Sequence, residues 1–130
     1  MSVLGDAKLH LAKAREFLEA ADVERDHELY NAAISNAVIS GINSKDAICL
    51  TLTRTTMKSK NHVDAVGELE AAGAMTQHAS TTGRLAGLLE LLLVMKTRAQ
   101  YAPYRFTHDD AVTAIEQAQK LLDGATTIVR

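Results

Sequence analysis

Residues 30–48 read YNAAISNAVISGINSKDAI, with no proline and with small side chains recurring every four positions. On an α-helix, Ala33, Ala37 and Gly41 lie along one side. A ridge of such small side chains lets another helix approach closely. Gly costs about 1 kcal/mol of helix propensity relative to Ala, so we expect a close contact at Gly41. The pattern predicts a helix over about 28–52 that makes a central helix contact.

Four further helices are predicted on either side of this segment. Each carries apolar residues at helical spacing on one face and polar residues on the other. Gly73 is expected to end the third of the five helices. The four predicted ranges are about 6–24, 62–72, 83–102 and 108–125.

Short boundary signals support three of these helix ends. Asn61 with Asp64, and Thr107 with Asp110, have the spacing of capping pairs at helix N-termini. Pro103 stops the fourth helix because proline lacks the backbone N–H that a helix interior needs. The sequence thus predicts an all-α, antiparallel up-and-down bundle of four to five helices.

Composition limits the remaining possibilities. A chain of 130 residues with 47% apolar content fits one globular domain over residues 1–130. The net charge of −2 gives no overall basic field for nucleic acid, although a local basic patch remains open. The oiliest segment, residues 85–95, is too short for a bilayer, and the N-terminus lacks the apolar stretch of a signal peptide. Together with the lone Cys49, these features favour a cytoplasmic protein without a membrane segment.

Familiar catalytic motifs are missing from the sequence. It contains no Gly-rich phosphate loop, no nucleophile elbow and no cysteine-based zinc site. No two of its five histidines have the i, i+4 spacing of a helical metal site. We therefore expect neither a metal nor a cofactor.

The segment 91–105, LLLVMKTRAQYAPYR, changes from an apolar run to a cluster of cations and phenols. Lys96 and Arg98 could handle phosphate at the rim of the bundle, or they could offset the helix dipole at a C-terminus. Tyr101 could contribute a hydroxyl to the same site, or it could pack at the edge of the core.

Asp46 stands out in the second predicted helix because it is an acidic residue within an apolar stretch. If buried, it should be paired, and Arg54, Lys96 or Arg98 could be its partner. A structural ion pair and a functional role are both open for it. His62, at the end of a basic loop, is most simply solvent-exposed.

Four segments taken together resemble the HEPN superfamily, in particular its small single-domain members from actinobacteria and their phages. The similarity runs from about residue 7 to residue 125, and its most specific parts are the second helix and KTRAQY. The segments are AKLHLAKAREFLEAA, YNAAISNAVISGINSKDAI, NHVDAVGELEAAG and LLELLLVMKTRAQYAPYRFTHDDAVTAIEQAQKLL.

The resemblance implies an all-α bundle that often forms a homodimer around its central helices. Many members are metal-independent ribonucleases with an Arg followed, after four to six residues, by a His. In that chemistry the His transfers a proton and the Arg holds the phosphate. Here Lys96 aligns with the Arg and Tyr101 with the His. Lys holds phosphate only as a point charge, and Tyr, with a reference pKa near 10, is a poor base at neutral pH.

Three hypotheses follow. In the first, the chain is a binding or interaction module that forms a homodimer or joins an antitoxin or other protein, and contacts RNA or a nucleotide. In the second, it is a divergent ribonuclease that uses Lys96, Arg98 and Tyr101, with Arg54 and His62 as further candidates. In the third, it is a purely structural helical protein. The small ridge of the second helix and the long apolar fourth helix favour a homodimer.

Overall fold

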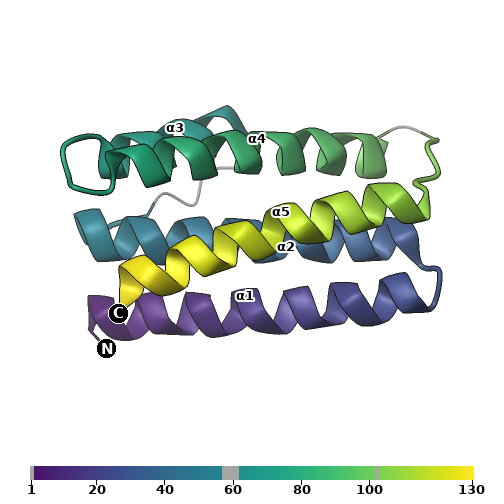
Figure 1. The fold of residues 1–130 in the computed structure, drawn as a ribbon, viewed down its shortest axis with the longest axis horizontal. Helices are drawn as coiled ribbons and strands as arrows, with labels where there is room; N and C mark the ends of the chain where they lie inside the picture. The colour runs from purple at the N-terminus through teal and green to yellow at the C-terminus, as the bar shows by residue number, and fades with distance from the viewer. Residues whose placement is uncertain (1, 57–61, 102) are drawn as a thin grey trace.

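The computed structural model describes residues 2–56, 62–101 and 103–130 (Figure 1). Five helices and no strand occur in these segments, so the predicted all-α class is confirmed. The helices are α1 (Val3–Asp26), α2 (Tyr30–Thr53), α3 (His62–Ala74), α4 (Ala79–Tyr101) and α5 (His108–Val129).

The four long helices alternate in direction along the bundle, and the short α3 lies beside α4 (Figure 1). α2 is the central element, since it packs against each of the other four helices. The two chain termini lie at one end of the bundle, together with the end of α2 and the start of α4. The α1–α2 turn and the α4–α5 linker lie at the other end (Figure 1).

The small ridge of α2 is buried as the spacing predicts. Ala33, Ala37 and Gly41 are all buried. A Cβ atom at Gly41 would lie 2.9 Å from Leu92 Cδ1 of α4 and 3.2 Å from Leu121 Cδ1 of α5. The missing side chain therefore allows two helices to approach α2, which confirms the close contact expected at this glycine.

The helix boundaries differ from the prediction in several places. α1 begins at Val3, three residues early, because the Ser2 hydroxyl accepts a hydrogen bond from the Gly5 N–H (2.9 Å) and caps the helix. α4 begins at Ala79 and not near Gly83, and α5 continues to Val129. The prediction that Gly73 ends α3 is wrong.

Gly73 lies inside α3, one residue before its end. A Cβ atom there would overlap the Thr82 side chain of α4, so this glycine provides a close helix contact and not a stop signal. The Thr107–Asp110 capping box is confirmed, with reciprocal hydrogen bonds of 3.2 Å and 2.9 Å. Asn61, the predicted cap of α3, lies outside the described residues.

Two further observations bear on the sequence predictions. None of the helices, over the residues that the structure describes, combines the length and the apolar character needed to cross a membrane. Cys49 is buried, and burial, with the nearby Glu68 carboxylate, raises the pKa of its thiol to about 12. The thiol is therefore neutral and packs as a small apolar side chain.

Candidate functional site

The predicted cations of α4 lie in its last turns. Lys96 is half-buried and Arg98 is exposed, and neither forms an ion pair with any residue in the described segments. Tyr101 is the last residue of α4, and its side chain lies outside the described part of the structure. The linker to α5 follows directly, at the end of the bundle that also holds the α1–α2 turn (Figure 1).

Asn31, in the first turn of α2, holds this linker in place. Its side-chain nitrogen donates to the Tyr104 carbonyl (3.1 Å), and its side-chain oxygen accepts from the Phe106 N–H (3.1 Å). Phe106 is buried in the core, and its ring packs edge-on against the ring of Tyr104 at 4.8 Å between centroids. The backbone on both sides of Arg105 is therefore fixed against α2.

A concavity of about 670 Å³ opens between the linker and the start of α2. Tyr104 lines it with 44% of its surface exposed, and Arg105, the next residue along the chain, also lines it. An exposed aromatic ring beside a cation can stack on a nucleobase while the cation meets a phosphate. The lining residues are Glu28, Leu29, Tyr30, Asn31, Ala32, Tyr104, Arg105 and Phe106.

The N-terminus of α2 contributes a positive partial charge to this concavity. Its N-cap residue, Leu29, makes no side-chain capping hydrogen bond, and no acidic residue occurs in the first turn. The first N–H groups of a helix lack intrahelical partners and favour an anion. Glu28 is the one acidic side chain in the lining. The arrangement is suited to a phosphate held beside a stacked ring.

The other predicted residues lie elsewhere. Arg54 is the exposed C-cap residue of α2, in the left-handed conformation with φ of 64°. α2 ends at the opposite end of the bundle from the last turn of α4 (Figure 1), so Arg54 is not brought together with Lys96 and Arg98. His62 is the first residue of α3, and its side chain lies outside the described part of the structure.

Asp46 is paired as expected, but with a different partner. Lys45 Nζ lies 2.6 Å from Asp46 Oδ1 and 2.6 Å from Glu68 Oε1 on α3. The expected partners Arg54, Lys96 and Arg98 are wrong. Arg54 points to solvent, and the two cations of α4 lie at the other end of the bundle, whereas the Lys45 side chain reaches both carboxylates.

Lys45 is an enclosed structural cation. Only 3% of its side chain is exposed. Burial alone would lower its pKa, but the hydrogen bonds and charges of Asp46 and Glu68 outweigh burial and raise its pKa above the ordinary value. Thr56 adds a hydrogen bond to Asp46 Oδ1 (2.7 Å). Lys45 therefore stays protonated and ties α3 to α2, and it is unsuited to act as a base.

Sequence reasoning missed Lys45 and Glu68 as a pair. A lysine inside a stretch of buried small and apolar residues was the available signal, but nothing in the pattern identifies an acid on α3 as its partner. Across the described segments, no group of three or more His, Cys, Asp or Glu side chains could hold a metal ion.

Comparison with models of protein families supports this resemblance. A family model of the HEPN domain matches residues 7–126, close to the span over which the sequence segments resemble that superfamily. No curated protein matches the chain.

Proposed function

The chain belongs to the HEPN family, and on that premise we propose that it is a binding and interaction module that associates with RNA or a nucleotide. The proposed binding surface is the end of the bundle that carries Lys96, Arg98 and the α4–α5 linker. A defence or toxin–antitoxin setting fits such a module. An antitoxin or nucleotidyltransferase gene beside this one would support that setting, whereas a cluster of phage structural genes would favour a structural role.

The observation that carries the proposal is the concavity lined by the exposed Tyr104, by Arg105 and by the N-terminus of α2, which has no side-chain cap. Single-stranded nucleic acid binds by stacking bases on aromatic rings, at about 1–3 kcal/mol per base, and by phosphate contacts with cations. Lys96 and Arg98 extend the set of cations along the same end. Binding through a few cations should be weak and should fall as salt is added.

Catalysis is the less favoured alternative. A divergent ribonuclease would use Lys96, Arg98 and Tyr101 in place of the family's Arg and His. Loss of a general base typically costs 10²–10⁴ in rate, and the ordinary pKa of tyrosine is near 10. We therefore expect little or no metal-independent cleavage of RNA.

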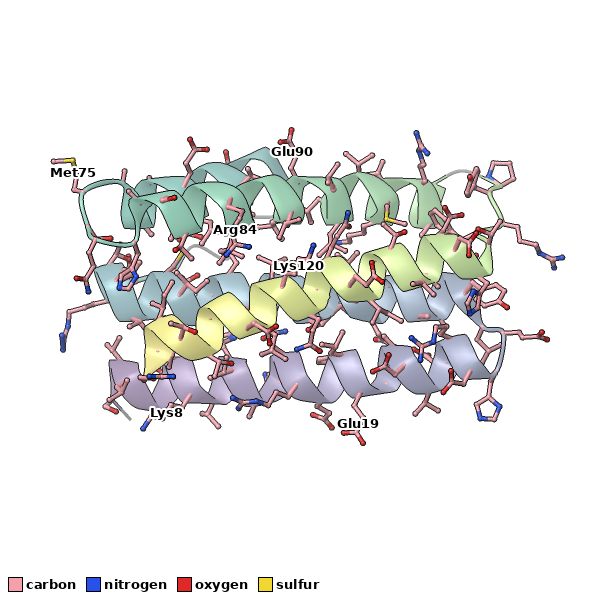
Figure 2. All side chains as sticks on the ribbon, viewed as in Figure 1. Lys8, Glu19, Met75, Arg84, Glu90 and Lys120 are labelled. Carbon is pink, nitrogen blue, oxygen red and sulfur yellow. The ribbon has the colours of Figure 1, made fainter. Side chains whose placement is uncertain are left out.

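Fluorescence anisotropy with labelled single-stranded RNA, in the presence of EDTA, tests both the proposed RNA binding and the expected absence of cleavage. The wild type should bind weakly, release RNA as salt rises and leave it intact. The Lys96→Ala/Arg98→Ala variant should bind more weakly. The matched control is Arg84→Ala/Lys120→Ala, which removes the same charge from exposed positions on α4 and α5 away from the linker (Figure 2).

Whether the protein cleaves RNA decides between the binding module and the divergent ribonuclease. RNA cleaved by the wild type but not by Tyr101→Phe would establish the ribonuclease. Cleavage that persists in Tyr101→Phe would direct attention to Arg54 and His62. Equal loss of binding in the two double variants would mean that net charge, and not this end of the bundle, governs the interaction.

The proposed homodimer needs a different surface from the one that the sequence indicated. The small ridge of α2 is already used inside the bundle, against α4 and α5. On the outer layer, an apolar groove of about 510 Å³ lies between α3 and α4. Val94 lines this groove and is 51% exposed, and Leu91, three positions earlier on α4, is 52% exposed. We propose that a second copy of the chain covers this face, because two such apolar surfaces bury each other about a two-fold axis.

Light scattering at tens of micromolar should therefore report a dimer. Leu91→Glu/Val94→Glu should shift the protein to monomer, because burying these charges costs more than the apolar contact provides. Leu4→Glu/Val23→Glu, at two comparably exposed positions on α1, should leave the dimer intact. A monomeric wild type would refute the dimer, and dissociation by the α1 variant alone would place the interface elsewhere.

A further inference from the structure

The short helix α3 has a peripheral place in the bundle. Over the described residues it contacts α2 and α4 but neither α1 nor α5, and it lies beside α4 at the edge of the molecule (Figure 1). The other four helices pack against one another without it, since α2 contacts α1, α4 and α5, and α5 also contacts α1 and α4. These four would therefore still form a complete antiparallel bundle if α3 were detached.

Few apolar contacts hold α3 in place. Leu69 and Ala72 are the buried apolar side chains among its described residues, whereas α5 buries apolar side chains along its whole length. α3 has 13 residues, and two of them, Gly67 and Gly73, lower its helix propensity. Isolated helices shorter than about 12–15 residues are marginal in water. The docking of α3 should therefore be a local equilibrium that is weaker than the packing of the bundle.

A buried ion pair closes α3 onto α2. Lys45 Nζ lies 2.6 Å from Glu68 Oε1 of α3, and it lies equally close to Asp46 Oδ1 on its own helix. The Thr56 hydroxyl also donates to Asp46 Oδ1 (2.7 Å). If α3 leaves, Glu68 returns to water while Asp46 stays beside Lys45. Detachment of α3 therefore leaves no buried charge without a partner.

Cys49 is placed where it can report whether α3 is docked. It is the only cysteine of the chain, and it is fully buried. It lies four positions after Lys45, on the same face of α2, and Lys45 meets Glu68 of α3. The Glu68 carboxylate also contributes to the raised pKa of the thiol, so its charge acts on Cys49. Loss of α3 should therefore open this face of α2, and with it the thiol, to solvent.

We infer that α3 is a releasable strap: it detaches from the other four helices as one unit while they stay packed, and its release uncovers the face of α2 that carries Cys49. The protein then has a closed form and an open form. The pairing of Lys45 with Glu68 favours the closed form. This inference depends on neither the RNA-binding surface nor the dimer proposed above.

Native-state hydrogen exchange locates the opening. Amides 69–73 of α3 should exchange through an opening whose urea dependence is less than about half that of global unfolding, because this slope scales with the surface exposed. Amides 115–122, in the centre of α5, should exchange only on global unfolding. The same free energy and slope for both sets would overturn the inference, since α3 would then open only together with the bundle.

Thiol labelling tests whether the same opening uncovers Cys49. With excess 5,5′-dithiobis(2-nitrobenzoate), the wild type should be labelled with the urea slope of amides 69–73. Glu68→Gln should speed labelling by about tenfold, the scale of one hydrogen bond to a charged group. The matched control is Glu70→Gln, which changes an exposed carboxylate of the same helix and should leave the rate unchanged. Labelling with the slope of global unfolding would show that release of α3 does not reach Cys49, and would overturn the inference.

A pair of glycine variants keeps the test decisive if Glu68→Gln does not fold. A Cβ atom at Gly67 of α3, or at Gly87 of α4, has no neighbour within 4 Å. Gly67→Ala should favour the helical, docked α3 and slow labelling by about fivefold, the scale of the difference in helix propensity between Gly and Ala. Gly87→Ala makes the same change in a helix that is folded in both forms, so its rate should equal that of the wild type. No slowing in Gly67→Ala, or equal slowing in both variants, would overturn the inference.

Discussion

At one end of the bundle, Lys96 and Arg98 form no ion pair with any described residue, whereas toward the other end Lys45 is enclosed between Asp46 and Glu68. The cations of α4 are therefore open to an anion from outside. The Lys45 charge is already compensated by these two carboxylates. Lys96 and Arg98 could be identified from the sequence because they are close together in it. The pairing of Lys45 with Glu68 is identified only in the folded chain.

Removal of the Lys45 side chain should have the largest effect on stability. Lys45→Ala leaves two largely buried carboxylates without their cation, and loss of one partner of a buried pair costs about 3–5 kcal/mol. Lys96→Ala, at the open end, should cost less than about 1 kcal/mol. Urea unfolding of the two variants measures the difference, and equal losses would mean that the two ends are not electrostatically distinct.

These two ends also show what the sequence could and could not predict. Helical periodicity and the small ridge predicted the elements and the core of α2. The cations of α4 are visible because they are neighbours in the chain. The contact between His10 and Asn43 joins residues 33 positions apart, and that between Lys45 and Glu68 joins residues 23 apart. Such pairs depend on how helices are rotated against one another, which periodicity does not determine to within a hydrogen bond.

Overpacking at Gly41, in the centre of the bundle between the two ends, should lower the stability of the protein. Gly41→Leu would push into Leu92 and Leu121, and overpacking of this kind costs about 1–3 kcal/mol. Gly83→Leu is the control, because a Cβ atom at Gly83 has no neighbour within 4 Å. Its melting temperature should hold or rise, since Leu favours a helix more than Gly does. An unchanged melting temperature for Gly41→Leu would show that the packing of α2 is misassigned.

Alkaline pH should lower the stability of the protein by a smaller amount, through the enclosed Lys45. The folded-state pKa of Lys45 is raised, so its contribution is fully present below the unfolded pKa of about 10.4. That contribution is lost as pH rises through the folded value. The urea midpoint of the wild type should therefore fall more steeply above about pH 10 than that of Lys45→Met. Parallel curves for the two proteins would contradict the role assigned to Lys45.

The claim that binding belongs to the open end is tested most directly by NMR. A ¹⁵N-labelled sample is titrated with a short single-stranded RNA, and the backbone amide shifts are mapped onto the bundle. We predict that the shifts concentrate at Lys96, Arg98 and residues 104–107, together with the first turn of α2, and that added salt reverses them. Shifts that concentrate instead at His10, Lys13 and residues 50–56, or the absence of any shift at low salt, would contradict the claim.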